Sequence, residues 1–188
     1  MRFLISLAAL AIIAPASATA QSVVTIGTSQ ARGCYEAAMS VTSRASTGLA
    51  LCEAALAQDA LSRRDRAATE VNMGILLMHA GRSDEALAAY DRALGIQPQL
   101  AEAWLNRGIA RFAAREYALA EADFTRSLEL NIREAHKAYY HRALALDARE
   151  LYPQAYADFQ QALELAPGWN LPLRELERYE VVRAPVNG

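Results

Sequence analysis

Among the side chains of this 188-residue sequence that could carry nucleophilic or metal chemistry are two cysteines and three histidines. Two metal ligands on one helix must lie three or four residues apart, whereas His136 and His141 are five apart and His79 is distant from both. The sequence contains no Gly-x-Ser-x-Gly nucleophile elbow, no glycine-rich phosphate loop and no histidine close to either cysteine. We therefore predict no catalytic residue, no metal site and no cofactor, in a protein that is not an enzyme.

The first 20 residues have the three parts of a secretory signal peptide. Arg2 is followed by an apolar run over residues 3 to 14, and small residues lead to Ala20. The run is shorter than the roughly 20 apolar residues of a membrane-spanning helix, and Pro15 follows it. We expect cleavage after Ala20, or alternatively after Ala18, with an uncleaved membrane anchor as the competing interpretation. The mature protein would then be periplasmic or secreted, without membrane insertion.

In an exported protein, an isolated pair of cysteines favours a disulfide, here between Cys34 and Cys52. Both fall on expected helices of one hairpin, where antiparallel neighbours can bring the two Cα atoms to the required distance of about 4.4 to 6.8 Å. Two reduced core cysteines are one alternative. A redox-active pair is another, although there is no Cys-x-x-Cys and Arg32 is the only basic residue within two positions of either cysteine.

The charge of the chain is ordinary for a globular protein. Loss of Arg2 with the leader would change 19 basic and 21 acidic residues to 18 and 21, a net charge of −3. The basic residues are spread along the sequence, so we expect no nucleic-acid partner. The remaining 168 residues suit one domain with a sizeable core.

A repeat organises the chain, and residues 101–134 are its clearest copy, with two short amphipathic helices joined by a turn. Its landmarks recur 34 and then 35 residues apart, as in a helical solenoid. Each copy has a small residue in its first helix, a second small residue early in its second helix, and a large aromatic one turn later. These are Gly74, Gly108 and Ala143, then Ala86, Ala120 and Ala155, then Tyr90, Phe124 and Phe159. Small residues let two helices cross closely, and the aromatic fills the gap beside them.

This pattern resembles the tetratricopeptide repeat family. The family motif is matched in the central unit by Trp104, Gly108, Ala120 and Phe124, in the third by Tyr139, Ala143, Ala155, Phe159, Ala162 and Pro167, and in the first by Gly74, Ala86, Tyr90, Ala93 and Pro98. The chain departs from the motif at Glu70, where the family prefers a large aromatic, at Arg107 and Arg142, where it prefers Leu, and at Arg111, where it prefers Tyr. The resemblance implies an all-α fold, a right-handed α-solenoid of helix-turn-helix repeats ended by a C-terminal capping helix.

The units divide the chain into a signal peptide over 1–20, an N-terminal arm and degenerate helical hairpin over 21–62, three repeat units over 63–168, and a capping helix with a tail over 169–188. In the degenerate hairpin, Ala50, Ala54 and Ala57 are expected to take the second-helix positions, with Ala50 falling 36 residues before Ala86. The capping helix is expected to run from Leu171 to about Val181, capped by Asn170.

The first helices of tetratricopeptide folds line a concave face, so the resemblance places candidate partner-binding residues there. They are Asn72 and His79, then Glu102 and Asn106, then Lys137, Tyr140 and His141, with Ile75, Leu105, Ile109 and Leu144 among them. Asn72, Asn106 and His141 are equivalent across the units and would form a polar row. An Asn amide can both donate to and accept from an extended peptide backbone, and Lys137 with His141 could meet a carboxylate. The alternative is that these groups are solvated or hydrogen-bonded locally, without a ligand.

Asn106 and Lys137 also match the carboxylate-clamp members of the family, which grip the C-terminal tails of chaperones. His141 stands where those members have Arg, and Val71 and Ile75 replace a Lys and an Asn. An exported protein would not meet those cytosolic partners.

We therefore predict a non-enzymatic protein-protein interaction module, or scaffold, of the bacterial cell envelope, which binds a peptide or protein in its concave groove. A self-associating structural protein, and hence a homo-oligomer, is the first alternative, because the N-terminal end has only a thin cap. An enzyme, or the regulatory subunit of an envelope enzyme, with a site on residues 21–46 is the second.

Overall fold

A computed structural model describes residues 29–40, 45–57 and 60–179 of the chain. These ranges hold nine helices and no strand: α1 Ser29–Met39, α2 Ala45–Ala57, α3 Arg63–His79, α4 Ser83–Ile96, α5 Ala101–Ala113, α6 Tyr117–Glu129, α7 Ala135–Asp147, α8 Tyr152–Leu165 and α9 Asn170–Leu176. The expected signal peptide and the arm over residues 21–28 lie outside the described residues, so both remain predictions.

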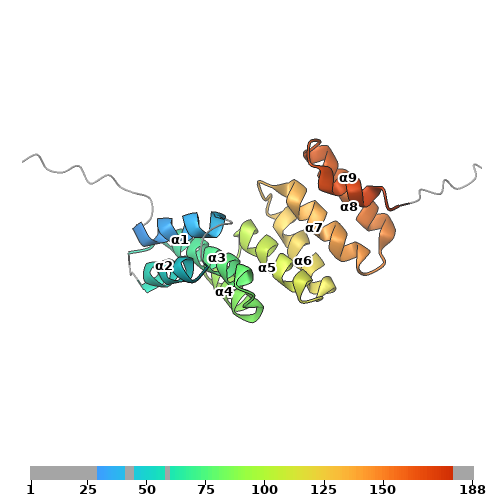
Figure 1. Cartoon of the computed structure of the whole chain (residues 1–188). Helices are drawn as coiled ribbons and strands as arrows, with labels where there is room; N and C mark the ends of the chain where they lie inside the picture. Colours follow the sequence, from blue (N-terminus) through green and yellow to red (C-terminus); the bar gives the residue numbers. More distant parts are fainter. Residues whose placement is uncertain (1–28, 41–44, 58–59, 180–188) are drawn as a thin grey trace, which may run out of the picture.

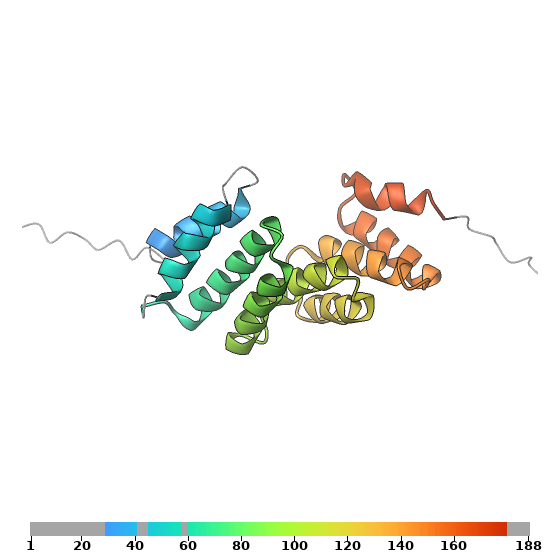
Figure 2. The same cartoon turned by 60° about the horizontal axis from the view of Figure 1, so that its bottom comes forward.

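The helices form a row of hairpins. Each of the pairs α1–α2, α3–α4, α5–α6 and α7–α8 packs within itself. Successive hairpins touch chiefly through the second helix of one and the first helix of the next, and also between their first helices α1, α3, α5 and α7. Figure 1 shows the hairpins following one another in chain order, and Figure 2 shows α1–α2 and α9 at opposite ends of the row. The predicted all-α solenoid of helix-turn-helix units is confirmed. We call α3–α4, α5–α6 and α7–α8 the first, second and third units.

The small residues in the first helices lie directly against the aromatic rings of the second helices, as predicted. A Cβ atom added to Gly74 would lie 2.4 Å from Cε1 of Tyr90, and one added to Gly108 would lie 2.6 Å from Cε1 of Phe124. Both distances are far below van der Waals contact. The third unit places Ala143 and Phe159 at the same positions, and both are fully buried.

A disulfide occupies this crossing position in the N-terminal hairpin. The end of α1 corresponds to the end of α3, and the start of α2 corresponds to the start of α4. In that register Cys34 stands where Gly74 does, and Cys52 stands where Tyr90 does. The two cysteines are buried and bonded, with their Cα atoms 4.8 Å apart, which confirms the predicted pairing. Sγ of Cys34 also lies 3.9 Å from the carbonyl oxygen of Thr69, so the disulfide packs against α3.

The predicted positions of the alanines in this hairpin are wrong. Ala50, Ala54 and Ala57 are exposed, whereas Gly48 and Ala55 are buried. The hairpin is shifted because α1 and α2 are joined through residues 40–44, while α3 and α4 are joined through the shorter segment 80–82. Two additional residues in the connection move the whole second-helix pattern by two.

Removing the disulfide should loosen the N-terminal hairpin more than the rest of the chain. In the chain-entropy model, a loop of this length contributes on the order of 3 kcal/mol. In a solenoid that loss falls mainly on the unit concerned and its neighbour. We expect Cys34→Ala/Cys52→Ala to speed amide hydrogen exchange in α1 and α2 while α7 and α8 keep their protection. Adding a reductant should speed amide hydrogen exchange in the wild type but not in the double variant. An equal loss of protection in α7 and α8 would contradict this account.

The departures from the repeat motif are explained by ion pairs within the units. Arg107 on α5 binds both carboxylate oxygens of Asp123 on α6, at 2.8 and 2.9 Å. Arg142 on α7 binds Asp158 on α8 in the same way, at 2.6 and 2.9 Å. Asp123 also accepts a hydrogen bond of 2.8 Å from Arg111. Each arginine that replaces an apolar residue of the family motif therefore has a buried carboxylate as partner.

These arginines also join consecutive units. Nη1 of Arg107 lies 2.6 Å from Asp91 on α4, and Nη1 of Arg142 donates to the hydroxyl of Thr125 on α6 at 3.3 Å. Asp91 and Thr125 are equivalent, being 34 residues apart. Each guanidinium therefore connects its own hairpin to the second helix of the preceding one.

The same pair of positions is matched differently in the other two hairpins. The first unit has Met73 and Ala89 there, so a large residue faces a small one. The N-terminal hairpin has Gly33 and Leu51, and a Cβ added to Gly33 would lie 3.0 Å from Leu51.

Glu70 on α3, a further departure from the repeat motif, pairs with Arg92 on α4 at 2.8 Å. Size or charge is thus complementary within each hairpin.

Ser127 stands where the equivalent positions carry Ala93 and Ala162. It is fully buried, and its hydroxyl has no hydrogen-bond partner among the described residues. A buried hydroxyl without a partner loses its hydration and gains nothing in return. We expect Ser127→Ala to raise the free energy of unfolding by about 1 kcal/mol, measured by urea denaturation. The reverse change, Ala162→Ser, should lower it, and a loss of stability in Ser127→Ala would show that the hydroxyl is satisfied.

The C-terminal end of the described chain is covered by α9 and residues 177–179. Leu176 and Tyr179 pack against the core of the third unit, and the hydroxyl of Tyr179 donates to Asp147 at 2.5 Å. The helix is shorter than predicted and ends at Leu176. Asn170 is its first residue rather than its cap, because the chain approaches in extended form through Trp169 without a side-chain cap.

Candidate functional site

The candidate site is the surface formed by the first helices, which we call the first-helix face. It comprises the half-buried and exposed side chains of α1, α3, α5 and α7, and Ile75, Ile109 and Leu144 among them also pack in part against the core. Ile75, Ile109 and Leu144 are equivalent and half-buried, and they form an apolar row across α3, α5 and α7. Asn72, Asn106 and His141 form the predicted polar row beside it, also half-buried.

The two asparagines of the polar row differ in their hydrogen bonding. Nδ2 of Asn106 donates to the backbone carbonyl of Glu102 at 2.7 Å, one turn earlier on the same helix. The Asn72 side chain has no partner within the described part of the chain. Asn72 therefore keeps both its donors and its acceptor for another molecule, whereas Asn106 keeps its carbonyl oxygen and one N–H.

His141 is held as a neutral imidazole. Its ring stacks on that of Phe124, with centroids 5.7 Å apart. Burial lowers the pKa of His141 to about 4, and the nearby charge of Lys137 adds to the shift. The imidazole is therefore uncharged at pH 7 and is not the cation that a carboxylate clamp would place here.

Lys137 is already paired with a carboxylate. Its ammonium lies 2.7 Å from Glu134, three residues earlier. Tyr140 packs against Trp169 and Phe159, with ring centroids 4.9 and 5.8 Å apart. Burial raises the pKa of Tyr140, and Glu175 adds to the effect while Arg174 opposes it. The third-unit end of the face is therefore aromatic and charge-balanced.

Glu102 and His79 are exposed, and neither makes a hydrogen bond or ion pair through its side chain within the described residues. The predicted residues thus lie on contacting helices, but they form no catalytic arrangement. No group of three or more His, Cys, Asp or Glu side chains suited to a metal ion occurs among the residues that the structure describes. None of the described helices is long and apolar enough to cross a membrane.

The sequence interpretation missed two residues on α1. In the register set by the helix ends, Tyr35 corresponds to Ile75 and Met39 corresponds to His79. Their exposed fractions are 53% and 65%, high values for large apolar side chains. The cysteine pair could have identified them from the sequence. If Cys34 takes the position of Gly74, the register of α1 follows without reference to the connection between α1 and α2.

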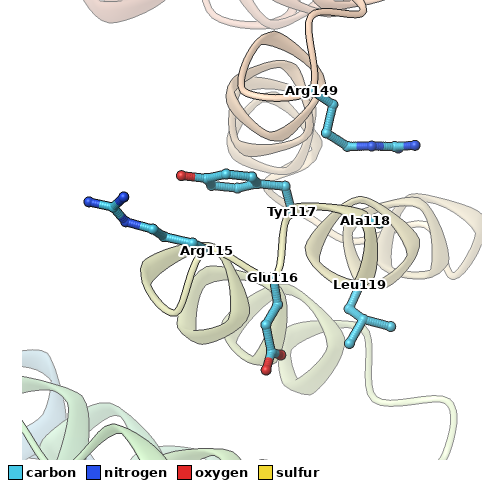
Figure 3. A pocket seen from close by; sticks show the side chains of 6 residues that line it. All are labelled: Arg115, Glu116, Tyr117, Ala118, Leu119 and Arg149. Atoms are coloured by element: carbon cyan, nitrogen blue, oxygen red, sulfur yellow. The ribbon is translucent and has the colours of Figure 1, made fainter.

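A hollow of about 410 Å³ lies where the turn between α5 and α6 approaches the end of α7. Figure 3 shows that the side chains around it, including Arg115, Glu116 and Arg149, point in different directions. Arg149 is ion-paired with Glu121. Nothing converges on this hollow, so the first-helix face remains the candidate site.

Comparison with known proteins places the chain in a family. The family model for the tetratricopeptide repeat matches residues 71–133 and 105–168, which together cover more than half of the chain. The chain belongs to the tetratricopeptide repeat family. No curated protein matches it.

Several solved structures are similar. The first tetratricopeptide domain of Spaghetti (RPAP3), bound to the HSP90 peptide SRMEEVD, is 29% identical, with 61% of this chain and 90% of that chain covered and a TM-score of 0.59. The second such domain of human RPAP3, in complex with the HSP70 peptide SGPTIEEVD, is 26% identical, with 62% and 96% covered and a TM-score of 0.58. MamA is 20% identical, with 70% and 74% covered and a TM-score of 0.62, a similarity of fold alone. The protein has the fold of a protein-interaction module, and the two RPAP3 domains hold peptides.

Proposed function

We propose that the protein is a non-enzymatic interaction module of the bacterial cell envelope that holds an extended segment of a partner protein on its first-helix face. One observation carries this proposal: an apolar row and a polar row run side by side across consecutive first helices, and Asn72 in the polar row has no partner within the described residues. An extended strand presents backbone amides and alternating side chains, which match such a surface.

Location in the envelope is supported by the sequence. Residues 1–20 have signal-peptide character, and a buried disulfide suits an oxidising compartment. We expect the mature chain to begin at Gln21 and to be recovered from the periplasm or the medium. Amino-terminal sequencing of the protein from cell fractions tests this, and a cytoplasmic chain beginning at Met1 would refute it.

The binding role is tested by changing the apolar row. Ile75→Ser/Ile109→Ser removes two apolar side chains that would contact a bound segment. We expect it to lower the recovery of crosslinked partners from intact cells by about tenfold or more, which corresponds to a loss of about 1.4 kcal/mol in binding free energy. Ala88→Ser/Ala122→Ser is the control, because both alanines are exposed on second helices. Equal circular dichroism spectra exclude misfolding, and equal partner recovery by both variants would remove the first-helix face from the account.

Self-association is a second candidate, favoured by apolar side chains at the C-terminal end. Leu171 and Leu173 on α9 and Leu165 on α8 are exposed. Exposed apolar patches often mark contacts between proteins. Light scattering at high protein concentration distinguishes the two roles, and a strict monomer would end this second candidate.

A further inference from the structure

We propose that the binding surface extends over four first helices, with α1 as its fourth, and that its occupant is a non-acidic extended segment inside a partner chain. This inference rests on the proposed function and specifies the partner of the same site. The occupant carries apolar side chains and a basic residue, and it does not present an acidic C-terminal tail.

The exposed side chains of α1 continue the rows of the other first helices. Tyr35 extends the apolar row of Ile75, Ile109 and Leu144, and α1 contacts α3 directly. The opposite side of α1 is buried through Cys34, Ala37 and Ala38, so the helix is held by its core face and presents Tyr35 and Met39 outward. The disulfide fixes this helix in the absence of the aromatic contact that fixes the other units.

A fourth helix lengthens the surface by a definite amount. Packed helices lie about 8 to 10 Å apart, and an extended chain advances about 3.3 Å per residue. Adding α1 therefore accommodates about three more residues of a bound segment than three units do.

The charges on the face argue against an acidic ligand. Arg32 on α1 is paired with Glu36 at 3.2 Å, and Lys137 is paired with Glu134 at 2.7 Å. His141 is neutral at pH 7. Each of the two cations therefore already has a carboxylate neighbour with which a ligand carboxylate would compete, and the imidazole carries no charge.

Two further groups of charges lie on the face, and Arg63 and Arg64 at the start of α3 are exposed without a carboxylate partner among the described residues. At the third-unit end, Asp147 is bound by Tyr179 and by Arg178, and the charges of Arg174 and Glu175 act on Tyr140 with opposite sign. Near the middle, Glu102 is exposed without a partner in the part of the chain that the structure describes. The uncompensated charge at the centre is therefore negative, and it favours a lysine or arginine in the bound segment.

The test uses the oxidised mature chain and a library of random twelve-residue peptides displayed on phage. No peptide in the library has a free C-terminal carboxylate, because the proposed occupant lies inside a partner chain. We expect selected peptides to be enriched in apolar residues and to contain Lys or Arg more often than Asp or Glu. Labelled synthetic copies should bind about tenfold more weakly to Tyr35→Ser/Met39→Ser and to Glu102→Lys, measured by fluorescence anisotropy. Leu119→Ser/Tyr152→Ser is the matched control, since both residues are half exposed but lie on the second helices α6 and α8, away from this face, and it should bind as the wild type does.

A shortened peptide gives an independent measure of the contribution of α1. Removing three residues from one of the two ends should weaken binding and also abolish the difference between the wild type and Tyr35→Ser/Met39→Ser. If neither shortened peptide abolishes this difference, the assignment of α1 as the fourth helix of the surface is refuted. Tighter binding of the acidic peptide SRMEEVD than of the selected peptides, or a selection dominated by Asp and Glu, refutes the charge assignment and leaves the proposed function intact. The proposed function fails, and this inference fails with it, if no peptide is selected. The same holds if Ile75→Ser/Ile109→Ser binds every selected peptide as tightly as the wild type does.

Discussion

Asp123→Ala is expected to lower the free energy of unfolding by about 3 to 5 kcal/mol, as breaking a buried ion pair does when the other charge stays behind. The Asp123 side chain is only 2% exposed, and it holds Arg107 and Arg111 together. Without it, two largely buried guanidinium groups lose their main partner. Urea denaturation followed by circular dichroism measures the loss.

Asp91→Ala is the matched control for this change. Asp91 binds the same Arg107, but its side chain is 60% exposed. Water replaces an exposed partner at little cost, so we expect a loss of less than about 1 kcal/mol. Equal losses in the two variants would mean that burial does not determine the contribution of the pair.

The third unit allows a rescue experiment on the same principle. Asp158→Ala alone leaves Arg142 without its carboxylate, whereas Arg142→Met/Asp158→Ala reproduces the apolar pair Met73 and Ala89 of the first unit. The double variant should be more stable than the single one, because no charge remains unpaired. A double variant less stable than Asp158→Ala would show that the arginine contributes chiefly through packing or through Thr125.

Gly108→Leu is expected to destabilise the protein by about 3 kcal/mol or more, at the upper end of the cost of overfilling a core. Even a single carbon at this position would lie 2.6 Å from the Phe124 ring, and leucine adds three more. The hairpin α5–α6 must therefore open or the ring must leave its position. Thermal and urea denaturation both measure the effect.

Gly95→Leu is the control for Gly108→Leu. Gly95 also lies in a helix, but it is exposed and a Cβ there meets nothing within 4 Å. Leucine is a better helix former than glycine, so this change should be neutral or stabilising. In the crowded unit, Gly108→Leu/Phe124→Ala should be more stable than the sum of its single changes predicts. Simple additivity would contradict a direct contact between the two positions.

The repeat units could be predicted because their landmarks are local in sequence. Gly74 recurs as Gly108 and Tyr90 recurs as Phe124, each 34 residues later, and glycine can be recognised by type as a position without a side chain. The fold followed from such features, and the disulfide followed from an isolated pair of cysteines on neighbouring expected helices of a chain with a signal peptide. The position of α1 relative to α2 did not, because a two-residue difference in a connection leaves no mark in the helical pattern. Ala50 was consequently placed on the core side although it is exposed.

The candidate site could be predicted only in outline. The sequence by itself determined that Asn72, Asn106 and His141 would share a row, since helical periodicity and repeat spacing place equivalent residues together. Its resemblance to the tetratricopeptide repeat family placed the face on the first helices of the three units, without α1. Only the tertiary structure decided their chemical state: the stacking of His141 on Phe124, the pairing of Lys137 with Glu134, and the freedom of Asn72. It also decided that Arg107 and Arg142 are core residues with buried partners. The physical reason is that the pKa, the hydrogen bonding and the exposure of a side chain depend on neighbours from other helices, which periodicity along a single chain does not specify.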